Sequence, residues 1–525
     1  MIDMPSSPEA AASDDTLFSD TKKSSGIDTI LAWLDMPQPK NPADQLLFLK
    51  IHLATLHLSE VQAFERLILL RSLCTRSVDV VQALIPEIVV TSLPVSKKKV
   101  HLVRNMQDIL QSLADDLMEL LPINDAGWID EPQSVHEWAL WQILHAFSLH
   151  IHLSMLIASP VAVGMWQQLH HVYEIAFLSK ISKNTPKNVL SSLRDVYYAT
   201  ILMGCIQPPS FNSEEINFIS SYFRLFSDQV YVTTLDNINN APSIFWINPQ
   251  CDAPAFACNR KQPLLRSNAH YFSCFLLVNL MQKHMKLLES GYSPDKIGLP
   301  DFASTSAGIN VLRRLVNYLG SPGQRRFPRR NQKYRIMLCT QIDTLWRLFQ
   351  HGEEASVEPS LWMVINESPD GLSIMHISGE TGDIALGDIA AICPENGGHW
   401  QICIVRWAIS ENQEDLEIGL QILATQAAPA SIPRYGEDGK GTSLSVLVLP
   451  SIPNLRSNEL LVVPAGSLKK CPDELILMVE KENLEIREVR RAALDEQNNR
   501  IEIYSIAPQE VSTTLPEEEE QAVFT

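Results

Sequence analysis

Basic side chains gather in one short stretch of a chain that is otherwise acidic. The chain has 525 residues and a formal net charge of −19. The sequence QRRFPRRNQKYR at residues 324–335 holds six cationic side chains: Arg325, Arg326, Arg329, Arg330, Lys333 and Arg335. Such charges repel one another unless an anion or carboxylates offset them. Guanidinium groups match phosphate, stack on flat rings and read the O6 and N7 atoms of guanine. The stretch therefore predicts a site for a phosphorylated guanine ligand.

A second polar motif follows the arginines after an interval rich in β-forming residues. The R-x-x-x-R spacing occurs in two overlapping registers, Arg325 with Arg329 and Arg326 with Arg330. The sequence NESPDG then gives N-x-S-x-x-G, with its defining residues at Asn366, Ser368 and Gly371. This order resembles the PilZ domain, the bacterial cyclic di-GMP receptor module, whose signature is R-x-x-x-R followed by [D/N]-x-S-x-x-G. The resemblance covers about residues 321–425 and includes the late segments IVRW and IGLQ.

The resemblance implies a ligand and a role for each motif residue. One arginine pair would contact phosphate and the edge or face of guanine, and either register is compatible with the sequence. Asn366 and Ser368 would bond to a guanine edge or to local backbone. Gly371 would permit a positive φ and the close approach of a base to the backbone. A charged-donor hydrogen bond contributes roughly 1.5–3 kcal/mol, so losing one arginine is expected to weaken binding by tens-fold or more.

Hydrophobic periodicity divides the chain into a helical part and a β part, which predicts a multidomain α+β protein. The helical part is expected to be an all-α bundle or irregular helical repeat with a small β insertion. A PilZ-like antiparallel β-barrel and a second small β domain follow it. The expected segments are a disordered tail at 1–25, the helical domain at 26–320 with its insertion at about 229–265, the barrel at 321–425, the second β domain at 426–508 and an acidic disordered tail at 509–525.

Several shorter stretches give local predictions. Asn212 and Glu215 are spaced as a helix capping box. The apolar stretch from Trp138 to Ala158 has no Asp, Glu, Lys or Arg, but its histidines favour a buried bundle helix over a membrane span. A helix is expected over residues 270–291, and a β-type run is expected over residues 334–349.

Composition excludes some classes of partner and compartment. The negative charge argues against general binding to nucleic acid or to an anionic membrane. The first 15 residues have neither a basic segment nor an apolar segment, so they do not predict a signal peptide. Nine scattered cysteines fit free thiols in a reducing cytoplasm. We therefore expect a cytoplasmic protein that neither inserts into a membrane nor binds nucleic acid.

No short motif indicates catalysis or a metal. There is no nucleophile elbow, dinucleotide fingerprint or recognisable acid/base pair of carboxylates. His145, His150 and His152 lack metal-ligand spacing, and the GEDGKGTS segment lacks the order of a phosphate loop. The sequence predicts neither an enzyme nor a cofactor or metal site.

These observations predict a signalling effector. Its barrel would sense cyclic di-GMP, and its helical module would transmit the output to an unidentified protein partner. An alternative is an interaction scaffold whose degenerate barrel binds no ligand. A nucleic-acid binder that uses the arginines is weaker, because exposed aromatic residues do not alternate with them.

Overall fold

The computed structural model describes residues 26–508, except for 37–40, 90–91, 122–132, 235–242, 263–267, 324–326, 353–356, 412–414, 436–440, 453–455, 470, 481–483 and 499. The expected tails at 1–25 and 509–525 therefore lie outside the described residues. The described chain forms two compact units that meet in sequence at residues 324 and 325. Residues 92–94 group with the second unit, and residues 409–413 group with the first.

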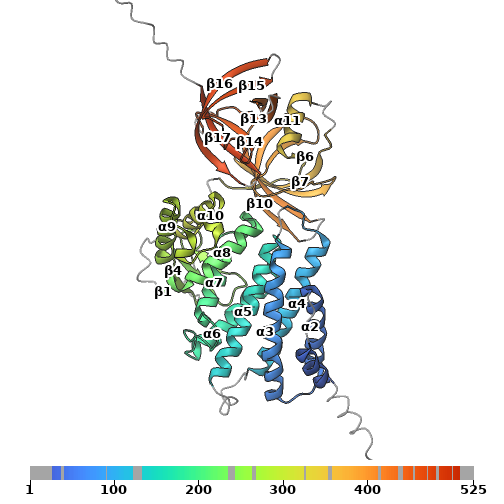
Figure 1. Cartoon of the computed structure of the whole chain (residues 1–525), viewed down its shortest axis with the longest axis vertical. Coiled ribbons are helices and arrows are strands. Elements are labelled where there is room, and N and C mark those ends of the chain that lie inside the picture. The colour runs from blue at the N-terminus through green and yellow to red at the C-terminus, as the bar shows by residue number, and fades with distance from the viewer. Residues whose placement is uncertain are drawn as a thin grey trace, which may run out of the picture. The chain divides into compact units, whose positions relative to one another are not determined.

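The first unit is built from helices (Figure 1). Residues 26–35 are helical. The helices that follow are α2 Pro42–Leu58, α3 Ala63–Ile88, α4 Lys97–Leu120, α5 Gln133–Leu156, α6 Met165–Leu178, α7 Leu193–Cys205, α8 Ser213–Phe226, α9 Phe275–Glu289 and α10 Ser306–Gly320. Short 3₁₀ turns lie at Pro208–Ser210, Ser227–Gln229, Pro294–Ile297 and Asp301–Ser304.

Helix α5 is apolar on every side and is buried, which confirms the prediction for residues 138–158. Its side chains His145, His150 and His152 are buried too, and burial lowers the pKa of each to about 4. These histidines are therefore neutral at neutral pH. Among the described helices, none combines the length and the apolar character that a membrane span requires.

Asn212 caps α8 as predicted. Its side chain accepts a hydrogen bond from the Glu215 N–H, and the Glu215 side chain accepts one from the Asn212 N–H. This reciprocal pair satisfies two N–H groups that the first turn of a helix leaves without partners. The sequence therefore sets the start of α8 locally.

A small antiparallel sheet interrupts the helices. Its strands are β1 Tyr231–Thr233, β2 Ile244–Ile247, β3 Phe256–Ala257 and β4 His270–Ser273, in the order β1-β4-β2-β3. The predicted helix at 270–291 is thus wrong at its start, because residues 270–273 form a strand and α9 begins at Phe275. Tyr271 and Phe272 pair with β2 and are buried. Tertiary pairing therefore overrides the apolar run that continues into the helix.

The second unit begins with a PilZ-like barrel. Its strands are β5 Arg330–Asn331, β6 Arg335–Thr340, β7 Ser360–Ser368, β8 Gly371–Ser378, β9 Ile389–Pro394, β10 Gln401–Ser410 and β11 Leu416–Ala424. The hydrogen-bonded order is β5-β7-β6-β9-β10-β11-β8, and β7 also pairs with β8. This last pairing closes six antiparallel strands into a ring and leaves β5 as an added strand beside β7.

Residues 342–351 form helix α11 (Ile342–His351), so the β-type run predicted over 334–349 is wrong beyond β6. The apolar residues Ile342, Leu345 and Leu348 recur at helical spacing and are buried. They join a core cluster with residues of β9, β10, β13 and β14. The helix forms because this spacing presents one continuous apolar stripe to the core.

A second closed antiparallel barrel follows, in the order β12-β13-β14-β17-β16-β15. Its strands are β12 Ala428–Tyr435, β13 Gly441–Leu449, β14 Glu459–Pro464, β15 Glu474–Glu480, β16 Leu484–Gln497 and β17 Ile501–Pro508. The two barrels share the core cluster that contains α11. The predicted fold class, a helical part followed by a PilZ-like barrel and a further β domain, is confirmed.

Candidate ligand-binding site

The two parts of the sequence motif lie on neighbouring strands. In the antiparallel register of β5 and β7, Arg330 is opposite Glu367 and Asn331 is opposite Asn366. The Gln332 N–H donates to the Ile365 carbonyl oxygen at 3.3 Å, which extends this pairing by one residue. The structure therefore brings the end of the arginine segment next to N-x-S-x-x-G.

Strand alternation separates the motif residues into two faces. Residues directly opposite each other project on the same side, and successive residues of a strand project on opposite sides. Arg330 thus shares a face with Glu367, whereas Asn331 shares the other face with Asn366. Ser368 stands two residues after Asn366 on the same strand, so it lies on the Asn331 face. We call the face of Asn331, Asn366 and Ser368 the asparagine face.

Asn366 presents an acceptor that the surrounding protein leaves unused. Its Oδ1 atom is buried and has no hydrogen-bond partner among the described residues. The register between β7 and β8 shifts between Val364 and Asn366, which marks a bulge at this point. Bulges re-aim side chains at the edges of sheets and next to functional sites. A buried amide oxygen without a partner favours a ligand donor at this position.

Ser368 and Gly371 close the hairpin between β7 and β8. The Ser368 hydroxyl donates to the Asp370 carboxylate at 2.7 Å and lies 3.2 Å from the Gly371 carbonyl oxygen. Gly371 does not have the positive φ that we expected. A Cβ atom there would lie 2.4 Å from the Leu420 carbonyl oxygen on β11, so close strand approach is what requires glycine.

The opposite face carries a tyrosine and an acid. The Tyr334 hydroxyl donates to the Glu367 carboxylate at 2.9 Å. Burial, followed by this hydrogen bond, raises the pKa of Tyr334 to about 12, so the phenol stays protonated at neutral pH. Sequence reasoning missed Asn331, Tyr334 and Glu367, because only the β5–β7 register shows that they flank the motif.

The basic residues that the structure describes here are accessible to solvent. Arg329, Arg330 and Lys333 are exposed, and Arg335 forms an ion pair with Glu395 at 3.7 Å. Arg325 and Arg326 lie outside the described residues. The structure thus places the second arginine of each R-x-x-x-R register beside the motif, and the first arginine of each register stays a prediction.

The late IVRW and IGLQ segments lie on β10 and β11. A Cβ atom at Gly419 would lie 1.8 Å from Trp407 Nε1, so the indole ring requires glycine there. The Arg406 Nε donates to the Gln421 amide oxygen at 2.7 Å. These contacts explain why both segments carry their particular residues within the barrel.

Comparison with known families finds two domain models that match the chain. A model described as "Cyclic-di-GMP receptor FimW, N-terminal domain" matches residues 28–236, and one described as "Cyclic-di-GMP receptor FimW, middle PilZ domain" matches residues 348–429. Together they match more than half of the chain. The chain belongs to the FimW family of cyclic-di-GMP receptors. The family is one of receptors rather than enzymes. The PilZ match includes N-x-S-x-x-G but begins after the arginines. No curated protein matches the chain.

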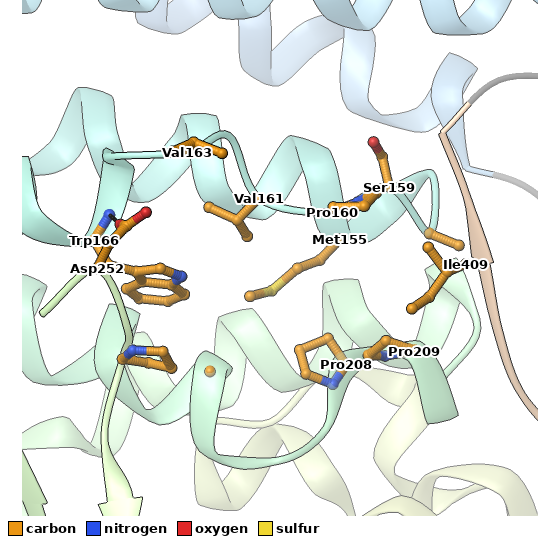
Figure 2. Close-up of a pocket in the computed structure, with 13 residues that line it drawn as sticks. Met155, Ser159, Pro160, Val161, Val163, Trp166, Pro208, Pro209, Asp252 and Ile409 are labelled. Carbon is orange, nitrogen blue, oxygen red and sulfur yellow. Dashed lines mark hydrogen bonds between the residues drawn. The ribbon is translucent and has the colours of Figure 1, made fainter. Parts of the chain in front are cut away.

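This FimW-family chain also has a cavity of about 330 Å³ in its helical unit, and Figure 2 shows Met155, Val161, Trp166 and Pro208 around it. Its acidic residue is Asp252, whose carboxylate accepts hydrogen bonds from the Gly164 and Trp166 N–H groups at 2.6 and 3.0 Å. The carboxylate therefore caps the first turn of α6. The cavity offers an apolar surface, and its one carboxylate is already engaged.

One described group has the residue types of a metal site in this FimW-family chain. Ligand atoms of His57, Asp116 and Glu119 lie within 4.8 Å of one another. The Arg66 guanidinium lies 2.9 Å from the Asp116 carboxylate and supplies a positive charge there. The Asp116 carboxylate accepts a hydrogen bond from the His57 ring, which raises the pKa of His57 as well. This arrangement is an ion-pair network that joins α2, α3 and α4.

Proposed function

We propose that this chain binds cyclic di-GMP on the asparagine face of the β5–β7 pair. The observation that carries the proposal is the register that sets Asn331 opposite Asn366. Arg329 precedes β5 by one residue, and continued extended backbone puts its side chain on the Asn331 side. The same alternation directs Arg330 toward Glu367. This favours the register Arg325 with Arg329 for ligand contact.

The chemistry of this face suits a guanine dinucleotide. Arg325 and Arg329 would bind phosphate or stack on a guanine ring, as charged planar donors do. The Asn366 amide oxygen would accept from the N1 or N2 donors of guanine, which would satisfy a buried atom. Ser368 would hold the hairpin in shape and offer its hydroxyl oxygen. Glu367 would stay on the opposite face, away from the phosphates.

Output through the helical unit is the second part of the proposal. Helix α10 ends at Gly320, and the arginine segment begins a few residues later. Ordering this segment around the ligand would change how the two units are joined, which could expose a surface for a protein partner in the cytoplasm. Hydrogen exchange over residues 305–335 tests this step. Equal protection with and without cyclic di-GMP would contradict it.

A ligand-free scaffold is the second candidate. The PilZ match begins after the arginine segment, and helix α11 lengthens the interval between the two motifs. In this case the helical unit would recruit its partner constitutively. Mutating the arginines would then leave partner binding unchanged.

Calorimetric titration with cyclic di-GMP separates the two candidates. The parent protein is compared with a variant in which Arg325, Arg326, Arg329 and Arg330 are alanine, and with the control Arg490→Ala, an exposed arginine of the second barrel. Binding by the parent and the control, with none by the fourfold variant, supports the receptor. Absence of heat from all three folded proteins supports the scaffold.

A further inference from the structure

Helix α2 is apolar on two opposite sides, yet only one side is covered. The buried side consists of Leu46, Leu49, His52, Leu53 and Leu56. The other side exposes Leu47, Phe48, Ile51 and Leu58 by 61%, 41%, 51% and 83%. With 3.6 residues per turn, these four side chains fall within an arc of about 100°. A helix that is apolar all round is normally buried, as α5 is, so the exposed stripe lacks its cover.

Helical segments that pack against α2 expose further large apolar side chains. Phe64 and Ile68, one turn apart at the start of α3, are 63% and 51% exposed. Leu31 and Met36, from the segment that packs Trp33 on His52 of α2, are 46% and 59% exposed. Figure 1 shows α2 at an edge of the helical unit. We call these eight residues the α2 surface: Leu31, Met36, Leu47, Phe48, Ile51, Leu58, Phe64 and Ile68.

The area of the α2 surface matches what a stable dimer needs. A fully exposed large apolar residue presents on the order of 200 Å². The eight residues therefore expose roughly 900 Å² together, close to the about 800 Å² that each partner contributes to a standard interface.

The charge on the stripe is compatible with contact between two copies. Asp44 is the acidic residue of the first turn of α2 and lies on the exposed side. In an antiparallel pair of α2 helices the two Asp44 carboxylates would lie at opposite ends of the contact. Antiparallel packing also opposes the two helix dipoles favourably. Self-complementary contact of this kind is what a two-fold interface requires.

The chain's own N-terminal segment is a poorer occupant. Residue 26, where the described chain begins, lies next to Thr55 and Ser59 of α2. The preceding 25 residues are rich in Ser, Asp, Ala and Pro, and their large apolar residues are confined to positions 1–4 and 17–18. Such a segment has too little apolar area to cover eight side chains.

We propose that the α2 surface binds a second copy of this chain, with α2 packed antiparallel on its counterpart. Each copy carries a formal net charge of −19, so the copies repel one another at long range. Added salt screens this repulsion. Association is therefore expected to strengthen as salt concentration rises, whereas a contact driven by opposite charges would weaken.

Sedimentation of the full chain over a concentration series tests the proposal. The parent is expected to reach twice the monomer mass, and Ile51→Glu is expected to weaken association by at least about tenfold. The matched control is Leu190→Glu, because Leu190 is fully exposed outside the α2 surface. Circular dichroism checks that both variants stay folded. A parent that stays monomeric at every concentration and salt level, or an Ile51→Glu variant that dimerises like the parent, overturns the proposal.

A crosslinking variant tests the geometry of the pair. Antiparallel packing centred near the middle of the stripe brings position 51 close to its counterpart. Ile51→Cys is expected to form an intermolecular disulfide under mild oxidation, and Leu190→Cys and the parent are not. Equal crosslinking of the two cysteine variants would overturn the assignment of this surface.

Discussion

Two groups of arginines, one in the second barrel and one at the edge of the first, have different surroundings. In the second barrel, Arg491 donates to the Cys471 carbonyl oxygen and the Asp473 carboxylate at 2.9 Å each, and Arg487 lies 3.1 Å from Glu459 and 2.8 Å from Glu485. At the edge of the first barrel, Arg330 is exposed on β5, the strand that pairs with β7.

This difference shows what makes an arginine available to a ligand. A guanidinium that already binds carbonyls and carboxylates holds the fold together, and removing it leaves those acceptors without their donor. An exposed guanidinium adds little to stability and can be used for binding. The arginine side chain is the same in both barrels, so its partners decide its role.

The largest effect on stability is expected for Arg491→Ala. This side chain is 13% exposed and donates to carbonyl oxygens and to the exposed Asp473 carboxylate, so its loss should lower the free energy of unfolding by about 1.5–3 kcal/mol. Its exposed neighbour gives the control, because Arg490→Ala should change stability by less than about 0.5 kcal/mol. Urea unfolding measures both. Loss of cyclic di-GMP binding by Arg491→Ala under conditions where it stays folded would break the contrast between the barrels.

Gly371→Ala should destabilise the first barrel by about 2 kcal/mol, because the added Cβ atom would meet the Leu420 carbonyl oxygen. Gly323→Ala is the control, since no atom lies within 4 Å of the added carbon. Thermal unfolding of the two variants checks this expectation. Equal stability would show that β8 and β11 can move apart without loss.

Asn366→Ala should weaken cyclic di-GMP binding by about two- to tenfold, which is the effect of one neutral hydrogen bond. Glu367→Gln lies on the opposite face and should leave affinity within about twofold of the parent, because it keeps a side chain of the same shape. Calorimetric titration distinguishes the two. A larger loss of affinity for Glu367→Gln than for Asn366→Ala would place the ligand on the Glu367 face and contradict binding on the asparagine face.

A pH-dependent effect is expected at Asp388, which pairs with Arg500 at 2.9 Å. Burial raises the pKa of Asp388 to about 6 in spite of this pair. The folded-state pKa lies above the unfolded value. As pH falls, the Asp388 carboxylate therefore binds a proton near pH 6 in the folded protein but only near pH 4 in the unfolded chain. The group's contribution to stability therefore rises on acidification and is lost as pH rises through about 6, by about 1 kcal/mol per pH unit.

Urea unfolding of the parent and of Asp388→Asn across this range measures the contribution. Relative to the variant, the parent should gain stability toward acid. A parent that loses stability relative to the variant would show that the ion pair with Arg500 outweighs burial.

Local sequence signals predicted much of the fold, and they supplied the motif residues of the proposed site. The spacing of Asn212 and Glu215 predicted the start of α8, and the order of the two motifs predicted a PilZ-like barrel. The apolar residues of α11 already had helical spacing, but they continue directly from the run of β6, and a short apolar run is ambiguous by periodicity alone. The strand at 270–273 was missed for the same reason.

The two faces of the site could not be predicted because they depend on strand register. A shift of one residue between β5 and β7 could set Arg330 opposite Asn366 in place of Glu367. Nothing in the sequence shows that Asn331 is opposite Asn366, or that Tyr334 reaches Glu367. The same limit holds for the second barrel, whose closure depends on pairings between distant strands.

The most direct test compares two double variants in calorimetric titration with cyclic di-GMP. Arg325→Ala with Arg329→Ala removes the pair assigned to the asparagine face, and Arg326→Ala with Arg330→Ala removes the same charge from the alternate register. The first variant is expected to bind at least about a hundredfold more weakly than the parent, and the second within a few-fold of it. Equal losses in the two variants, or no binding by the folded parent, would contradict a cyclic di-GMP site on this face.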